Sequence, residues 1–375
     1  MTASIANFRQ QARQWLQANA PNEPPPEDGP ASREYVLAWQ KTQAQGGWAG
    51  LNWPKEVGGR GLTVREQIIW FEEYARAGAP SPLNASFVGL NHAGPTLIAC
   101  GTSAQKAYHL RRILAGEVIW CQGFSEPGAG SDLGSLRTRG HIEDNELVID
   151  GHKTWSSFAD IADWQELLIR TDPGAKTSAA LTWVICPMNA PGITVRPIRT
   201  MAGPRKYCEV FYESVRVPLS NVVGGVNNGW GTAMSTLSFE RGTAALALLI
   251  SYIIRVEQLL EACPPERVEL RLRLARLRAE GASIRAATYR FALDCENSVP
   301  DASGSMMRLS FAEFSQRVTA AAIDLYGIDA PEVVGMHGWG HDYLDTFSET
   351  IAGGTAEIQR NIIGERVLGL PKGPR

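Results

Sequence analysis

The hydrophobic pattern of this 375-residue chain changes twice, and these changes constrain the fold more than any single motif. From residue 8 to about residue 114, apolar residues recur every three or four positions, as in amphipathic helices. From about 117 to 223 the chain is rich in alternating, β-branched and turn-forming residues, which predicts strands. Helical spacing returns from Trp230. Strands gathered in one block, without helices between them, predict an antiparallel sheet or barrel and not a βαβ fold.

We therefore expect an α+β fold of three domains. An N-terminal all-α domain covers residues 1–116, a middle antiparallel β domain covers 117–226, and a C-terminal helical bundle domain covers 227–375. Within the last two, the pattern predicts strands at 146–150, 180–186, 193–196 and 208–212, helices at 268–292, 310–326 and 355–367, and a loop at 301–305.

The composition excludes several classes of function. A formal net charge of −3 argues against nucleic acid as a partner. The longest apolar stretch, 244–254, is too short to span a bilayer, and residues 1–15 hold no secretory signal. The six cysteines and six histidines have no metal-ligand spacing, which favours free buried thiols in a reducing compartment. We expect a cytosolic protein that binds neither membrane nor metal.

Residues 120–132 suggest a binding loop for a flat ligand. An apolar run meets a Ser-Glu-Pro turn and a Gly-Ala-Gly loop, where backbone N–H groups and small hydroxyls can approach a ligand closely. The segment Gly128–Leu133 begins like G-x-G-x-x-G, but it lacks the third glycine and a following helix, so it is not a dinucleotide fingerprint. Trp155 precedes two serines and adds an aromatic face. The alternatives are a glycine-rich turn without a ligand and an ordinary core indole.

At these residues the chain resembles the acyl-CoA dehydrogenase family, and the resemblance covers nearly its whole length. The family's two flavin signatures look like residues 121–132 and 151–157. The entry to its C-terminal domain looks like 237–241, and its C-terminal signature looks like 353–360. Four motifs in this order and spacing are specific. The resemblance implies a C-terminal four-helix bundle and FAD as cofactor.

The resemblance also implies a role for each matching residue. Ser125 should hydrogen-bond the pyrimidine side of the flavin, Ser157 should lie near N5, and Trp155 should pack against the ring system. The other positions that match cofactor-binding residues of the family are Gln122, Phe124, Gly130, Ser156, Thr355 and Glu357. Ser131 and Arg241 match positions on the CoA side of the substrate.

The family's reaction requires a carboxylate that removes the α-proton of a thioester while the β-hydride passes to flavin N5. The resemblance implies that the backbone N–H of Gly353 helps to polarise the thioester carbonyl. Many members carry the base where this chain has Gly353, but isovaleryl- and long-chain-type members use the position of Glu240. We expect Glu240 to be the base. A structural Glu240–Arg241 pair, a surface-facing Glu240, Glu349 and Glu357 are the alternatives.

Two departures from the family concern substrate and assembly. Glycine at 353 removes bulk beside the reacting carbons, which favours a branched or bulky acyl group such as a terpenoid or steroid side chain. In homotetrameric members, two segments contribute to the FAD site of a neighbouring subunit. The corresponding residues here, 255–265 and 324–331, do not match those segments, although Arg255 or Arg267 could replace the missing arginine. The chain is thus expected in a homotetramer or in an α2β2 assembly with a related subunit.

The resemblance names electron-transferring flavoprotein as the electron acceptor. Two alternative functions remain open at this point. One is a non-catalytic or flavin-receiving subunit of a heteromeric acyl-CoA dehydrogenase. The other is a flavin oxidase, or a dehydrogenase of carrier-protein thioesters.

Overall fold

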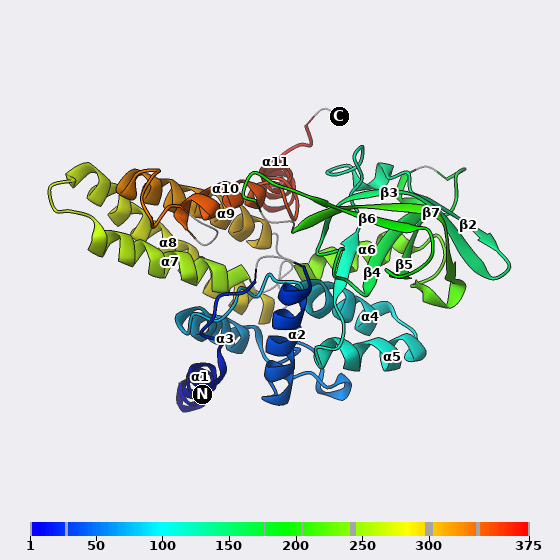
Figure 1. Cartoon of the computed structure of the whole chain (residues 1–375), viewed down its shortest axis with the longest axis horizontal. Coiled ribbons are helices and arrows are strands. Elements are labelled where there is room, and N and C mark those ends of the chain that lie inside the picture. Colours follow the sequence, from blue (N-terminus) through cyan, green and yellow to red (C-terminus); the bar gives the residue numbers. More distant parts are fainter. Residues whose placement is uncertain are drawn as a thin grey trace.

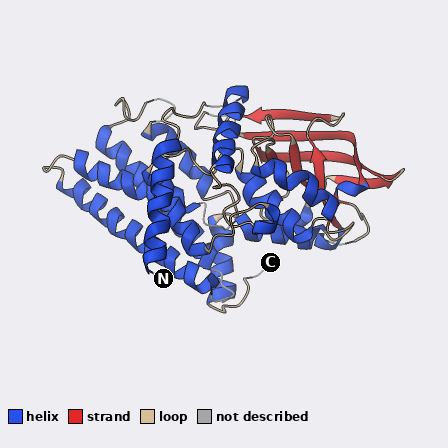
Figure 2. Cartoon of the chain, turned by 90° about the horizontal axis from the view of Figure 1, so that it is seen from below, coloured by secondary structure: helices blue, strands red, loops and turns tan. Residues whose placement is uncertain are grey.

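The computed structural model describes residues 2–26, 29–175, 177–203, 206–240, 245–296, 303–334 and 338–373. The molecule is elongated, with a bundle of long helices at one end and the sheet at the other (Figure 1). The N-terminal helices lie beneath the middle of this arrangement and extend under the sheet. Figure 2 shows the strands gathered at one end and helices filling the rest. This agrees with the predicted α+β fold.

The N-terminal region is helical, as predicted. Two of its helices begin with a capping box, Thr63 with Glu66 and Thr102 with Gln105, which satisfies backbone N–H groups that lack a helical partner. The elements are α1 (Thr2–Asn19), α2 (Gly29–Gln45), η1 (Lys55–Val57), α3 (Val64–Arg76), the π-helix η2 (Gly89–Ala93), α4 (Gly94–Cys100) and α5 (Ser103–Leu114).

The middle region forms one sheet, in which the described strands have the order β6-β7-β3-β2-β4-β5-β8, with β1 beside β4. The strands are β1 (Trp120–Gly123), β2 (Arg139–Glu143), β3 (Glu146–Ser157), β4 (Trp164–Arg170), β5 (Leu181–Pro187), β6 (Ile193–Ile198), β7 (Tyr207–Pro218) and β8 (Val222–Val223). All four predicted strands are present.

The sheet is mostly antiparallel, with one difference from the expectation. Strand β1 runs parallel to β4, and β2 also meets β4 in the parallel sense. The long connection over residues 124–138 explains this, because it carries the chain back before β2 begins. The glycine-rich loop therefore lies between two strands of the same direction. No helix interrupts it beyond the short 3-10 turn η3 (Leu133–Ser135), in keeping with the rejection of a dinucleotide fingerprint.

The C-terminal region is helical, but its first helix lies with the sheet. The side chains of Trp230, Ala233 and Leu237 in α6 belong to the same apolar cluster as Trp183 of β5 and Leu97 of α4. The elements are α6 (Gly229–Glu240), α7 (Ala245–Ala262), α8 (Val268–Glu296), α9 (Ser303–Tyr326), α10 (Trp339–Glu349), α11 (Ala356–Ile362) and the π-helix η6 (Ile363–Val367). Short 3-10 turns η4 (Thr177–Ala180) and η5 (Leu219–Asn221) complete the chain.

Helix α9 corrects one sequence-based expectation. It begins at Ser303, so part of the predicted 301–305 loop is helical, while residues 301 and 302 lie outside the described residues. Ser, Gly and Ser at 303–305 are weak helix formers, but the side chain of Ser305 is fully buried. Packing outweighs the small differences in helix propensity here.

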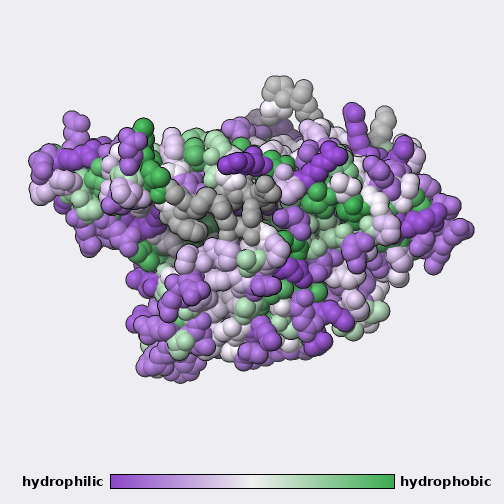
Figure 3. Space-filling model, viewed as in Figure 1, coloured by the Kyte–Doolittle hydropathy of each residue, from purple (hydrophilic) through white to green (hydrophobic). Residues whose placement is uncertain are grey.

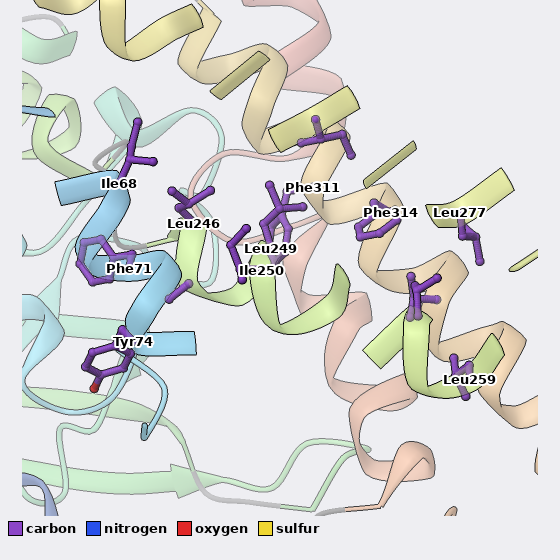
Figure 4. Close-up of a cluster of buried hydrophobic side chains, with 14 of the residues drawn as sticks. Ile68, Phe71, Tyr74, Leu246, Leu249, Ile250, Leu259, Leu277, Phe311 and Phe314 are labelled. Atoms are coloured by element: carbon purple, nitrogen blue, oxygen red, sulfur yellow. The ribbon is translucent and has the colours of Figure 1, made fainter. Parts of the chain in front are cut away.

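One apolar core joins the N-terminal helices to the bundle. Ile68, Phe71 and Tyr74 of α3 face Leu246 and other residues of α7, as Figure 4 shows. The same cluster continues along α7 to Phe311 and Phe314 of α9. Hydrophilic residues cover most of the face in Figure 3, especially its two ends. Among the described helices, none is long and apolar enough to cross a membrane.

Candidate active site

A cavity of about 320 Å³ lies where the sheet, the N-terminal helices and the bundle meet. Its helical side is apolar and continuous with the core, because Ile68, Leu246, Leu249 and Phe311 belong to both. Five of the residues that the motifs single out also line it: Gln122, Ser125, Trp155, Ser157 and Gly353. The two that lie farthest apart in the sequence, Gln122 and Gly353, are separated by 231 positions.

Trp155 is held in a strained and open position. The pairing of β3 with β7 shifts register between Lys153 and Ser156, and at this bulge Trp155 has φ of 61°. A bulky residue in the left-handed region costs about 1–3 kcal/mol, and such strain gathers at functional sites. The indole is 57% exposed and touches only the edge of Tyr207, with ring centroids 5.9 Å apart, among its described ring contacts. It therefore offers the cavity a free flat face.

A buried ion pair holds the loop that carries Ser125. The Lys153 ammonium is fully buried and donates to Glu126 Oε1 at 2.8 Å and to the Phe124 carbonyl at 3.0 Å. Glu126 also accepts from the backbone N–H of Thr138 at 2.8 Å. Burial lowers the pKa of Lys153 to about 8, against the opposing effect of Glu126. Removing one member of such a pair is strongly destabilising, so the loop is fixed in place.

A second buried carboxylate lies behind Gln122. Gln122 of β1 is the cross-strand neighbour of Glu166 of β4. Its Nε2 donates to Glu166 Oε1 at 2.8 Å, and His92 Nδ1 lies 3.1 Å from the same oxygen. His92 itself lines the cavity. Sequence reasoning missed His92 and Glu166, although a glutamate inside the apolar strand Trp164–Arg170 was a visible signal.

The turn that carries Gly353 is held from two helices. Gly353 and Gly354 both have positive φ, 64° and 92°. Arg308 of α9 donates to the backbone carbonyls of Glu349 at 2.8 Å and Ala352 at 3.0 Å, and Gln359 of α11 donates to the Gly353 carbonyl at 3.0 Å. These contacts fix the backbone of the turn beside the cavity.

Two acidic candidates, Glu349 and Glu357, lie on either side of this turn. Arg308 also pairs with the Glu349 carboxylate at 2.6 Å. Glu357 is exposed on α11, and its own backbone N–H, followed by the hydroxyl of Thr355, lowers its pKa. Thr355 Oγ1 accepts from the backbone N–H of Ile358 and caps α11. Glu349 lines the cavity but is held in this ion pair, whereas Glu357 is not among the lining residues.

Among the described residues, several predicted positions are not part of the cavity lining: Phe124, Gly130, Ser131, Ser156, Thr355 and Glu357. The side chain of Phe124 is buried in the sheet core, as is Ser156, whereas Gly130 and Ser131 are exposed in the loop. Glu240 is the last residue of α6, but its side chain lies outside the described residues. Arg241 also lies outside the described residues, and the alternative Glu240–Arg241 pair lies there with it.

Comparison with known families agrees with this arrangement of elements. Three family profiles match consecutive parts of the chain, the acyl-CoA dehydrogenase N-terminal domain at 2–117, the middle domain at 121–215 and the C-terminal domain at 227–368. The chain belongs to the acyl-CoA dehydrogenase family. As a member of this family it is an oxidoreductase, as predicted. Members of the family depend on FAD.

Relatives and solved structures cover the whole chain. Acyl-CoA dehydrogenase IpdE1 of Mycobacterium tuberculosis is 37% identical over 98% of both chains, and acyl-CoA dehydrogenase FadE26 of the same organism is 33% identical over 88% of this chain and 86% of its own. A structure described as the Tcur3481-Tcur3483 steroid ACAD superposes with a TM-score of 0.87 at 31% identity, covering 99% of this chain and 98% of that one. The ChsE4-ChsE5 complex from Mycobacterium tuberculosis gives 0.81 at 30% identity over 100% and 99% of the two chains.

Proposed function

We propose that this chain is an FAD-dependent dehydrogenase that introduces an α,β double bond into a bulky acyl-CoA. The observation that carries the proposal is the strained, exposed indole of Trp155 in one cavity with Ser125, Ser157 and Gly353. These residues fit a flavin, because the cavity supplies a flat aromatic face and two hydroxyls along one side. At Gly128 and Gly130 the loop also leaves open space for a ligand beyond the cavity.

Bound there, FAD would accept the hydride from the β-carbon. The chain's own residues hold the ring system through Trp155, Ser125 and Ser157, and orient the thioester through the N–H of Gly353. Hydrogen bonds to the thioester carbonyl stabilise the negative charge that develops on it as the α-proton leaves. We assign that proton to the carboxylate of Glu240, which leaves the α,β-unsaturated thioester as product.

The substrate is proposed to be a bulky or branched acyl group of the terpenoid or steroid type. Glycine at 353 leaves room beside the reacting carbons, and apolar side chains of α3, α7, α8 and α9 line the space beyond it. A polycyclic hydrocarbon would fill such a cavity without leaving polar groups unpaired. The description of a similar solved structure as a steroid ACAD supports this proposal.

We further propose an α2β2 assembly in which a related subunit completes the flavin site. Arg255 and Arg267, the two candidates to replace a donated arginine, are engaged within this chain. Arg255 pairs with Asp342 at 2.6 Å and stacks on Trp339 at 3.6 Å, and Arg267 donates to the carbonyls of Asp324 and Leu325 at 2.8 Å. Two similar structures are also described as pairs of chains. A cytosolic location and electron-transferring flavoprotein as acceptor belong to the same proposal.

Anaerobic titration with acyl-CoA tests the reaction. The flavin absorption should bleach with a steroid side-chain thioester and much less with butyryl- or octanoyl-CoA. A clear preference for the straight chains would refute the bulky substrate. The Glu240→Gln variant should retain flavin, but its rate of flavin bleaching should fall at least about a hundredfold, the usual contribution of a general base. Near-normal turnover would refute the assignment of Glu240.

Co-purification with flavin quantitation tests the assembly. The chain expressed alone should hold substoichiometric FAD and gain it when a related subunit is coexpressed. A stable tetramer of this chain alone, with one FAD per subunit, would refute the α2β2 proposal while leaving the reaction intact.

A further inference from the structure

Glu166 occupies a position where burial of a carboxyl group costs folding free energy. Its side chain is completely buried, and it lies on β4 directly before Leu167 and Leu168, which are also completely buried. A buried ionised carboxylate loses its hydration, and replacing such a group by a well-packed apolar residue is often neutral or stabilising. The fold alone therefore does not explain why a glutamate stands here.

The hydrogen bonds of Glu166 fix the orientation of Gln122. Gln122 Nε2 donates to Glu166 Oε1 at 2.8 Å, so the amide nitrogen of the carboxamide is the atom that faces the carboxyl group. The carboxamide is planar and carries its oxygen on the opposite side from this bonded N–H. Gln122 also lines the cavity, so the carboxamide atom left for a ligand there is the carbonyl oxygen.

His92 braces the same carboxylate from a different layer. It lies on the π-helix η2 (Gly89–Ala93), a kind of irregularity that is frequent at functional sites. Its Nδ1 lies 3.1 Å from Glu166 Oε1 and 3.3 Å from Gln122 Nε2, so the imidazole contacts both members of the pair. Phe87 packs edge-on against the imidazole, with ring centroids 5.1 Å apart. The carboxylate thus lies between a strand and a helix, and both residues that contact it, Gln122 and His92, also line the cavity.

We propose that Glu166 and His92 are positioning residues that hold Gln122 as a hydrogen-bond acceptor for an N–H group of the bound flavin. The inference rests on the proposed function for the identity of the ligand. A carboxamide can present either a donor or an acceptor, and an unbraced glutamine would sample both. The buried carboxylate removes the donor orientation, so the cavity wall presents oxygen before the cofactor arrives. Such preorganisation reduces the cost of binding.

A double-mutant cycle tests this coupling in the protein as purified, with its partner subunit where one is bound. Glu166→Gln frees the carboxamide of Gln122 to turn over, and it should weaken FAD binding about three- to tenfold, the value of one hydrogen bond. Gln122→Met should weaken it similarly. In the Gln122→Met background, Glu166→Gln should add nothing, because the residue through which it acts is gone. The readouts are the dissociation constant of FAD and the visible spectrum of the bound flavin.

Variants of His92 provide the control for folding. His92→Asn keeps an N–H donor close to the place of Nδ1 and should restore most of the affinity that His92→Phe loses. If Glu166→Gln does not fold, His92→Phe enters the same cycle with Gln122→Met. Additive losses, or variants that change only the melting temperature of the flavin-free protein, would overturn the inference.

The two proposals fail separately. A wild-type protein that binds no FAD, even with its partner subunit, would refute the proposed function. A wild-type protein that binds FAD while Glu166→Gln and His92→Phe show the same affinity and spectrum would refute only this inference.

Discussion

Two neighbouring cross-strand pairs of the β1–β4 ladder show how one framework supplies both stability and a site. Trp120 faces Trp164, and two residues further along, on the same face, Gln122 faces Glu166. A histidine from the helical layer covers each pair. His109 packs edge-on against both indoles, with centroids 5.1 and 4.9 Å away, whereas His92 contacts the Glu166 carboxylate. The two pairs share the same strand backbone and the same covering layer of helices, and they differ only in their side chains.

The difference separates what the fold requires from what the site requires. The apolar pair belongs to the core cluster that joins the sheet to α4, α5 and α6. The polar pair lies at the cavity and carries the cost of a buried carboxylate. Variants of the first pair should therefore change the free energy of unfolding, and variants of the second should mainly change ligand binding. The following predictions test this separation.

The largest effect is expected from Trp120→Ala. The indole is completely buried and stacks on Trp164 with centroids 6.1 Å apart, so its removal leaves a large cavity. The free energy of unfolding should fall by about 3–5 kcal/mol, measured by urea denaturation. A loss below about 1 kcal/mol would contradict a structural role for this pair.

His109 should make stability depend on pH. Burial, and after it the charge of Arg112, lowers the pKa of His109 to about 4 from an ordinary value of 6.5. Between these two values the unfolded chain binds more protons, so stability is full above pH 6.5 and is lost as pH falls toward 4, by about 3 kcal/mol. Denaturation curves at pH 7.5 and 4.5 measure this. In His109→Phe that part of the pH dependence should disappear, and an unchanged dependence would show that other groups cause it.

Converting the polar pair to an apolar one should separate folding from binding. The triple variant His92→Phe, Gln122→Met, Glu166→Met should keep the free energy of unfolding of the flavin-free protein or raise it by about 1–2 kcal/mol. Its FAD affinity should fall more than tenfold. Glu166→Met alone is the matched comparison, and it should lose about 1 kcal/mol because the buried amide of Gln122 loses its acceptor. A triple variant as destabilised as Trp120→Ala would show that the fold needs this pair as well.

The smallest change in stability is expected at the opposite wall, from Arg308→Met. Arg308 is partly exposed, so its ion pair with Glu349 and its bonds to the turn should contribute about 1 kcal/mol. The KM for acyl-CoA should rise nevertheless, since the Gly353 backbone loses its support. Arg308→Lys keeps the charge but not the forked geometry and should recover only part of the effect. Steady-state kinetics alongside thermal melting distinguishes the two contributions.

The sequence predicted the layers of this fold better than the relations between them. Periods of 3.6 and 2 residues are local properties, so helices and strands such as α8 and β7 were visible in the pattern. Motifs likewise singled out Trp155, Ser125 and Gly353, which share one cavity. The parallel pairing of β1 with β4 was not visible, because it depends on the path of a long loop.

The residues that brace the site were also beyond local reasoning. His92 and Glu166 are separated by 74 positions and meet only when η2 packs on β4. A histidine near a helix start and a glutamate in a strand have many ordinary explanations, and no motif joins them. The packing of α6 against the sheet could not be predicted from local sequence either, because its apolar residues could pack equally well on the sheet or on the helical bundle.

The cavity has a consequence for the order of events during synthesis. Its lining runs from Ile68 of α3 to Gly353, near the end of the chain. The sheet can pair its strands as soon as residue 223 has left the ribosome, and Trp155 can take its place then. The apolar side of the cavity must wait for α7, α8 and α9, and the turn at Gly353 comes last. A nascent chain therefore exposes the flat aromatic side of the site well before the pocket closes, and the proposed flavin would be enclosed only at the final stage of maturation.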